Sequence, residues 1–232
     1  MAVSQDATGR WFVSLLCDDV IAETIATSAV GIDAGLDSLL TLSTGEKVPN
    51  RRHERQDRVR LARAQRRLAR KAKGSNNRAK ARVKVARVQA RIADRRHDHL
   101  HKLTTRLGRE NQTLVIEDLS VRNMVRNRSL ARAISDAAWR KLRTMLEYKT
   151  DWHGGNLIVV DRWFPSSKLC SVCGVLAEKM PLSVREWTCR CGTIHDRDVN
   201  AARNSPQRAH ARTRQSVPKQ ENPRATKGIP AL

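Results

Sequence analysis

Four cysteines in two close pairs constrain this chain more than any other feature of its sequence. The spacing is Cys-x2-Cys-x15-Cys-x-Cys, formed by Cys170, Cys173, Cys189 and Cys191. A glycine follows the second cysteine of each pair, as in tight turns that aim two thiolates at one tetrahedral zinc ion. No signal peptide or membrane span is apparent, so we expect a cytoplasmic protein, whose reducing surroundings disfavour disulfides. The spacing therefore predicts a zinc ribbon over residues 166–195.

Two details of this pattern leave alternatives open. The second pair is one residue shorter than the usual Cys-x2-Cys, and His195 follows four residues after Cys191, where it could replace a cysteine as ligand. The same four cysteines could also be free thiols or form two disulfides. Paired spacing in a reducing compartment favours zinc.

The charge of the chain indicates a polyanionic partner. The sequence holds 45 Lys and Arg against 23 Asp and Glu, a formal net charge of +22, and arginine dominates the cations. Arginine pairs bidentately with phosphate, so the excess favours nucleic acid over membrane. Aromatic residues make up only 3% of the chain, which argues against recognition built mainly on base stacking.

The basic residues concentrate in a predicted helical hairpin over residues 51–107. Apolar residues recur at helical spacing, and the Gly74–Asn77 segment interrupts them. Residues 51–100 carry 19 Arg or Lys and only four Asp or Glu. A solvated helix face is the simpler interpretation, but such faces usually mix both signs to gain ion pairs. We therefore predict nucleic-acid contact here, and the candidate contacts are Arg63, Arg66, Arg67 and Arg70.

Three acids lie in or beside apolar segments that read as parts of a core. Asp33 lies within a predicted strand, Glu117 ends another, and Asp198 begins a helix after the cysteines. Three converging carboxylates would hold two Mg²⁺ or Mn²⁺ ions on either side of a scissile phosphate. Gly31 and Gly35 are expected to let a phosphate backbone approach the first strand. For any single acid, a surface residue or helix cap is an equally good interpretation.

The order of the predicted elements indicates the fold class. Three strands, a helical hairpin, a strand ending in Glu117, helices, another strand and the Asp198 helix follow one another, as in an α/β ribonuclease H-like fold with a mixed sheet. A further strand over Gly9–Asp19 stands near the start of the chain with almost nothing before it to pair with. Residues 205–232 have no apolar period and are expected to be a disordered basic tail.

Four motifs also resemble a known family. GIDAGL, VIEDLSVRNM, DRWFPSSKLCSVCG and CGTIHDRDVNAARN occur in the order found in TnpB (OrfB) proteins of bacterial insertion sequences, relatives of type V CRISPR effector nucleases. The resemblance covers about Gly9 to Asn204. It implies a RuvC-like, Mg-dependent nuclease core with a zinc ribbon before its last catalytic acid, and RNA-guided cleavage of DNA. By motif, Asp33, Glu117 and Asp198 match the catalytic acids.

The resemblance also implies a division of the chain and a departure from the family. Family members carry a β-rich wedge domain, interrupted by a helical recognition module, before the nuclease, and the chain looks truncated by comparison. We expect residues 1–28 to be a wedge remnant, 29–165 the nuclease core with its hairpin, 166–195 the ribbon, and 196–204 the last nuclease motif. The second cysteine pair is shorter than the commoner family form.

The expected partners follow from the resemblance and the charge. They are DNA and a guide RNA from the end of the element, without a membrane, for a monomeric protein associated with the bacterial nucleoid. Truncation puts guided targeting in doubt while leaving the catalytic half complete. Two other functions compete with the nuclease: a DNA-joining transposase, and a non-catalytic basic remnant that only binds nucleic acid.

Overall fold

The computed structural model describes residues 1–17, 28–178, 180–181 and 183–213, and its centre is one mixed β-sheet. The strands are β3 (Ala29–Ala34), β4 (Ser38–Leu42), β5 (Lys47–Pro49), β6 (Thr113–Glu117) and β7 (Asn156–Val160). Their order across the sheet is β5-β4-β3-β6-β7. β3 pairs antiparallel with β4 and parallel with β6, which pairs parallel with β7. The predicted α/β class with a mixed sheet is confirmed.

One face of the sheet carries the main hydrophobic core. Side chains alternate along a strand, so Val30 and Ile32 of β3 point to the same face, and Leu114 and Ile116 of β6 join them there. Two helices cover this face, α2 (Asn76–Glu110) and α5 (Trp139–Trp152). Leu107 of α2, with no exposed surface, lies in this core.

The opposite face is covered by α6 (Arg197–Thr213), which approaches β3 closely. A Cβ on Gly31 would lie 1.9 Å from the Ala202 carbonyl oxygen, so no larger residue fits. A Cβ on Gly35 would lie 2.9 Å from the Ser38 carbonyl oxygen, within the turn to β4. The prediction that these glycines admit a phosphate backbone is therefore wrong. The absence of a side chain at Gly31 lets α6 pack closely against β3, and its absence at Gly35 allows the tight turn to β4.

The same helix corrects the predicted extent of the disordered tail. Residues 205–213 are helical, although Pro206 lies inside α6. Asn204 anchors the helix, because its buried side-chain amide donates to the Ser166 and Leu169 carbonyl oxygens, at 2.7 Å each. Tertiary contacts of this kind stabilise a helix that lacks an apolar period. The rest of the predicted tail, residues 214–232, lies outside the described residues.

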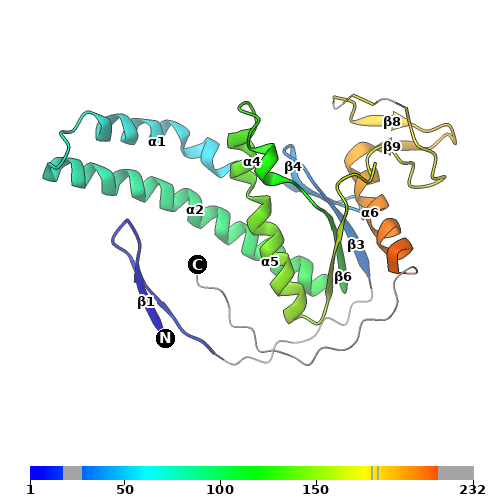
Figure 1. Cartoon of the computed structure of the whole chain (residues 1–232), viewed down its shortest axis with the longest axis horizontal. Coiled ribbons are helices and arrows are strands. Elements are labelled where there is room, and N and C mark those ends of the chain that lie inside the picture. Colours follow the sequence, from blue (N-terminus) through cyan, green and yellow to red (C-terminus); the bar gives the residue numbers. More distant parts are fainter. Residues whose placement is uncertain (18–27, 179, 182, 214–232) are drawn as a thin grey trace.

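The predicted basic hairpin is formed by α1 (His53–Ala69) and α2, which lie antiparallel and project from the sheet (Figure 1). Ser75 caps α2, since its side chain accepts a hydrogen bond from the Arg78 backbone N–H. α2 has 35 residues and is about 52 Å long. The first half of α2 forms the hairpin with α1, and its second half packs in the core against the sheet. One continuous helix therefore connects the hairpin to the core.

A separate two-stranded hairpin lies at the start of the chain. β1 (Ala2–Gln5) pairs antiparallel with β2 (Trp11–Ser14), so the expectation that this early strand lacks a partner is wrong. Gly9, at φ 88°, takes the left-handed conformation that the turn needs. Residues 18–27 of the predicted wedge remnant lie outside the described residues.

The remaining elements connect the core to the cysteines. α3 (Val121–Met124) and α4 (Ala131–Ala137) lie between β6 and α5, and β8 (Glu186–Thr188) pairs antiparallel with β9 (Ile194–Asp196) in the ribbon. α6 starts at the residue that follows β9. Among the described residues, no helix combines the length and apolarity needed to cross a membrane.

Candidate functional site: an acidic sheet edge beside a four-cysteine ribbon

Strand register brings the first two predicted acids together. The register between β3 and β6 pairs Ile32 with Ile116, and the next residues on the two strands are Asp33 and Glu117. Neighbouring residues of parallel strands point to the same face, so both carboxylates face the side of the sheet that α6 covers. Both side chains are partly exposed.

The third acid is brought to this edge by the ribbon and α6. β9 ends at Asp196, which caps α6: its Oδ1 accepts the backbone N–H groups of Asp198, at 3.1 Å, and Val199, at 3.0 Å. Lys47 on β5 holds the other oxygen of Asp196 at 2.6 Å. Asp198 therefore lies in the first turn of α6, and its carboxylate, 23% exposed, takes no part in the cap.

The charges of the other two acids act on Asp33. Burial and the charges of Asp198 and Glu117 raise the pKa of Asp33 to about 7, although Arg197 partly opposes them. Burial and neighbouring Asp118 raise the pKa of Glu117. Within the described part of the chain, no hydrogen bond or ion pair reaches the carboxylate of Asp33 or of Glu117. Crowded, unpaired carboxylates of this kind are a chemically suitable donor set for a divalent cation.

Two acids beside the motif positions have structural partners instead. Asp118 accepts from Arg143 at 2.7 Å and also from Arg162. Asp196 is the cap described above. Burial raises the pKa of Asp196, but Lys47 and the backbone N–H groups outweigh this effect and lower it overall. Neither residue has the free carboxylate that a metal ligand needs.

The four cysteines lie together in the ribbon as their spacing predicts. Their sulfur atoms all lie within 4.8 Å of one another. Cys170 Sγ is 3.8 Å from Cys191 Sγ, and Cys173 Sγ is 3.5 Å from Cys189 Sγ. Tetrahedral zinc with Zn–S bonds of 2.3 Å separates its sulfurs by about 3.8 Å. None of the four forms a disulfide, so the structure does not contain the disulfide alternative.

His195 lies next to this cluster without joining it. Its Nε2 is 3.1 Å from Cys170 Sγ, and the side chain is buried. Within the part of the chain that the structure describes, the group of ligand atoms within 4.8 Å of one another consists of the four cysteines. At this distance its imidazole can form a hydrogen bond with the Cys170 sulfur.

Arg185, on the ribbon, was not foreseen in the sequence. One guanidinium nitrogen lies 3.7 Å from Asp198 Oδ1, and another contacts Asp37 in the turn after β3. Among the described residues, it is the cation that forms an ion pair with one of the three acids. Its spacing from the cysteines carries no recognised pattern, so only the assembled site reveals it.

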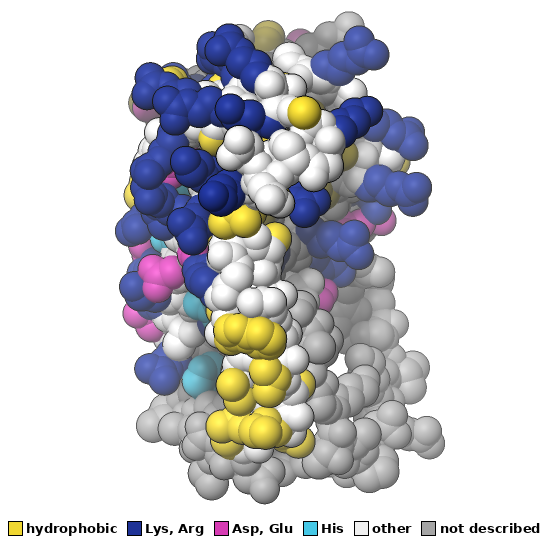
Figure 2. Space-filling model, turned by 90° about the vertical axis from the view of Figure 1, so that its left-hand side faces the viewer, with side chains coloured by type: hydrophobic (Ala, Val, Ile, Leu, Met, Phe, Trp, Pro, Cys, Tyr) yellow, Lys and Arg dark blue, Asp and Glu magenta, His cyan; other side chains and the backbone are white. Residues whose placement is uncertain are grey.

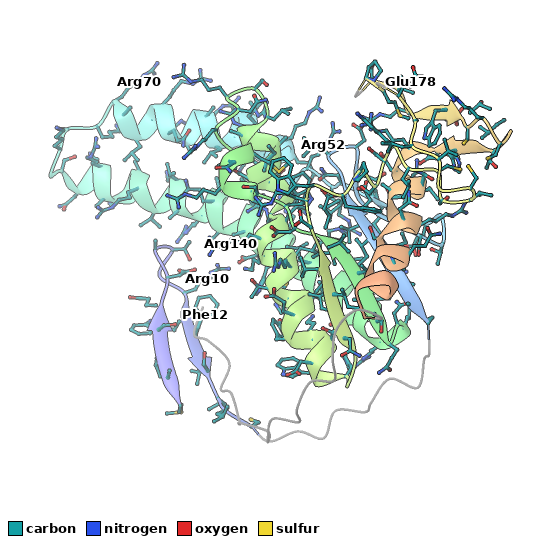
Figure 3. All side chains as sticks on the ribbon, turned by 45° about the vertical axis from the view of Figure 1, so that its right-hand side comes forward. Arg10, Phe12, Arg52, Arg70, Arg140 and Glu178 are labelled. Carbon is teal, nitrogen blue, oxygen red and sulfur yellow. The ribbon has the colours of Figure 1, made fainter. Side chains whose placement is uncertain are left out.

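The hairpin contains a basic groove between its two helices. The groove encloses about 440 Å³, and six cations line it: Arg60, Arg63, Arg67, Lys84, Arg87 and Arg91. Of the predicted contacts, Arg63 and Arg67 line this groove, whereas Arg66 and Arg70 are not part of its lining. Figure 2 shows Lys and Arg side chains gathered over this end of the molecule, and Figure 3 labels Arg70 near the hairpin tip.

A second basic groove, of about 920 Å³, lies between the hairpin base and the ribbon. Its cations are Arg52, Arg55, Arg58, Arg128, Arg132 and Arg185. Asp37, Glu54 and Asp136 also line it, so it is less one-sided than the hairpin groove. Figure 3 labels Arg52 in this region, between the hairpin and the ribbon that carries Glu178. Arg185 lines this groove and also forms the ion pair with Asp198 at the acidic edge.

Comparisons with known proteins match two parts of this chain to family models. A family model described as "Probable transposase" (OrfB_IS605) matches residues 12–128, and another, "Cas12f1-like, TNB domain", matches residues 139–205. The chain is 64% identical to a Streptomyces pristinaespiralis protein named "Putative RNA-guided DNA endonuclease", over 100% of this chain and 62% of the relative. The Escherichia coli K12 protein InsQ, of the same description, is 37% identical over 91% of this chain and 56% of its own length.

A solved structure shares the fold. The cryo-EM structure of a Cas12f1–sgRNA–target DNA complex matches with a TM-score of 0.56 and 16% identity, over 79% of this chain and 39% of that one. The chain thus spans 62% and 56% of the two curated relatives above.

Proposed function

Because the chain belongs to the OrfB_IS605 family, we propose that it is a metal-dependent DNA endonuclease of the RNA-guided TnpB type, with a RuvC-like core. The observation that carries the proposal is the meeting of Asp33, Glu117 and Asp198 at one sheet edge. These acids come from three distant segments, yet burial, together with the nearby charges of Asp198 and Glu117, raises the pKa of Asp33 to about 7. Keeping such a carboxylate charged is a cost to folding, which a bound cation would offset.

The three carboxylates would hold one or two Mg²⁺ or Mn²⁺ ions. Such ions supply an activated water and stabilise the leaving oxygen of a phosphodiester. The chain's own contribution is to orient the carboxylates: Asp33 and Glu117 through strand register, and Asp198 through the cap at Asp196. Arg185 would bind a substrate phosphate, since it is 57% exposed and already reaches Asp198.

The ribbon would hold one structural zinc ion through its four cysteines. Its sulfur distances fit that ion, and β9 runs from the cysteines directly into the helix that carries Asp198. Zinc would therefore fix the position of Asp198 and Arg185, both of which depend on the ribbon.

The two basic grooves would hold DNA and RNA. The hairpin groove has six cations and no acid in its lining, so phosphate contact there is expected to be strong and independent of base sequence. A guide RNA is proposed because relatives are named as RNA-guided and the structural neighbour was solved with sgRNA and target DNA.

Cleavage of labelled single-stranded DNA by the purified chain with Mn²⁺ tests the proposal. Replacing Asp33, Glu117 or Asp198 singly by Ala should abolish cleavage, and the triple variant should be no worse than the singles, because each acid holds a metal that the others cannot hold alone. Asp151→Asn, an exposed acid on α5, is the control and should cleave normally. A Glu117→Ala variant that cleaves like the wild type would refute the three-carboxylate site.

The grooves favour one alternative, a protein that only binds nucleic acid. It predicts that the wild type and the three alanine variants bind equally and that none of them cleaves. A DNA-joining transposase instead predicts strand-transfer products with the same DNA.

A further inference from the structure

A cavity on the core face of the sheet opens beside Glu117. It encloses about 420 Å³ between the sheet and α5, with a floor formed by the buried side chains of Ile32, Leu40, Ile116 and Leu146. Glu117 and residues 119–122 form one wall. The cavity therefore shares a residue with the acidic edge but lies on the opposite face from α6. Its volume is within the range of small-molecule sites.

The chemistry of the lining changes from floor to rim. The floor is aliphatic, and Trp139 of α5, 4% exposed, contributes an aromatic ring. The rim carries three arginines. Arg143 is committed to Asp118 and Glu147, at 2.7 and 2.9 Å. Arg122 and Arg140 are exposed and form no ion pair among the described residues, and Figure 3 labels Arg140 at the start of α5.

This combination suits a ligand with a flat, largely apolar body and an attached anion. A nucleotide has that form, since its base can enter an apolar cavity while its phosphate stays at a cationic rim. An aromatic molecule without a phosphate would leave the rim arginines without a partner, and free phosphate would make no contact with the apolar floor. A nucleotide chain crossing the edge at Glu117 would also place a base at this opening.

We propose that this cavity binds the base of a nucleotide next to the scissile phosphate, with Arg122 and Arg140 on its backbone phosphate. The cavity thus fixes the position of the strand relative to the carboxylates. This assignment rests on the proposed nuclease function for its biological meaning, but binding of a nucleotide to the cavity is measurable without cleavage.

The test is nucleotide binding to the ¹⁵N-labelled full chain in buffer without Mg²⁺ or Mn²⁺. The indole N–H resonance of Trp139, identified by its loss in Trp139→Phe, is the reporter. Thymidine and deoxyadenosine 5′-monophosphates should shift it saturably at millimolar concentration, whereas 2-deoxyribose 5-phosphate should not. Equal shifts with the baseless sugar phosphate, or no shift with either nucleotide, would overturn the proposal.

Two variants locate the binding. Thr144→Phe places a ring at the cavity from an exposed position of α5 and should abolish the shift, whereas Ser135→Phe on α4, outside the lining, should keep it. Arg140→Gln should weaken nucleotide binding about five-fold, and the matched Arg109→Gln should not. A shift that survives Thr144→Phe would contradict the assignment. If the wild type showed the nucleotide-dependent shift but did not cleave DNA, the proposed nuclease function would be refuted and the proposed nucleotide-binding cavity would stand.

Discussion

The ribbon and the acidic edge are both suited to metal ions, yet the chain prepares them differently. The four sulfurs come from residues 170–191 and all lie within 4.8 Å of one another. The three carboxylates come from residues 33–198, and no such grouping of their oxygens occurs in the described part of the chain. One site is gathered by local turns, and the other by strand register and the seating of α6 on Gly31.

The difference follows from what the two sites would do. A structural zinc site is closed, so its ligands fill the coordination sphere of the ion. A catalytic site for hard cations keeps room for water and substrate oxygens, so its carboxylates stand further apart. The ribbon is thus expected to be complete without substrate, and the edge to tighten only when cations and a phosphate are present.

The largest expected effect concerns the dependence of the edge on the ribbon. Cys170→Ser should release zinc and reduce cleavage at least a hundred-fold, because Asp198 and Arg185 lose their support. Metal analysis and single-turnover cleavage measure the two losses. Cys17→Ser removes an exposed thiol far from the ribbon in sequence and should change neither. Normal cleavage by a zinc-free Cys170→Ser variant would show that the regions are independent.

A smaller effect is expected for the residue that links the regions. Arg185→Ala should slow single-turnover cleavage about ten- to a hundred-fold while zinc content stays unchanged, because it removes a phosphate donor and no zinc ligand. Arg190→Ala is the matched control, since Arg190 lies on the ribbon and pairs only with exposed Glu178. If the two variants lost the same fraction of the cleavage rate, Arg185 would act only through long-range attraction of the DNA and not through a specific phosphate contact.

We expect the DNA to be bound mainly by the hairpin groove, away from the acidic edge and the ribbon. Replacing Arg63 and Arg67 by Gln should weaken DNA binding about ten-fold at low salt, more than the same change at Arg66 and Arg70, which do not line the groove. Zinc content and the cleavage rate at saturating DNA should not change. Titration of fluorescent DNA at several salt concentrations measures the difference, and indistinguishable double variants would contradict a defined groove.

The two regions also differ in how far their sequence predicted them. The cysteine pairs are close in sequence, so spacing alone located the ribbon. The meeting of Asp33 with Glu117 was predictable only from the order of elements. The use of Gly31 was misjudged because the helix that fills its space follows about 170 residues later. Arg185 was missed because no spacing rule marks a residue whose role is set by two neighbours from different segments.

The smallest expected effect is a gain in stability at the edge. The pKa of Asp33 in the folded chain, about 7, lies above its ordinary value of 3.8. The folded state therefore binds more protons than the unfolded state between these values, and stability falls as the pH rises through this window. Asp33→Asn removes the charge and should be more stable than the wild type by about 1–2 kcal/mol at pH 8, after allowance for solvent screening, with no advantage near pH 4.

Urea unfolding in buffer without Mg²⁺, with zinc retained, measures this difference between Asp33→Asn and the wild type across the pH range. Asp151→Asn should show no gain, since Asp151 is exposed on α5. Adding Mg²⁺ at pH 8 should stabilise the wild type and not Asp33→Asn, because the cation binds the charged form and offsets the repulsion. If Asp33→Asn were no more stable at pH 8 than the wild type, burial and the neighbouring acids would not disfavour the charged form of Asp33 in the free protein. The acidic edge would then carry no free-energy cost for a metal ion to offset.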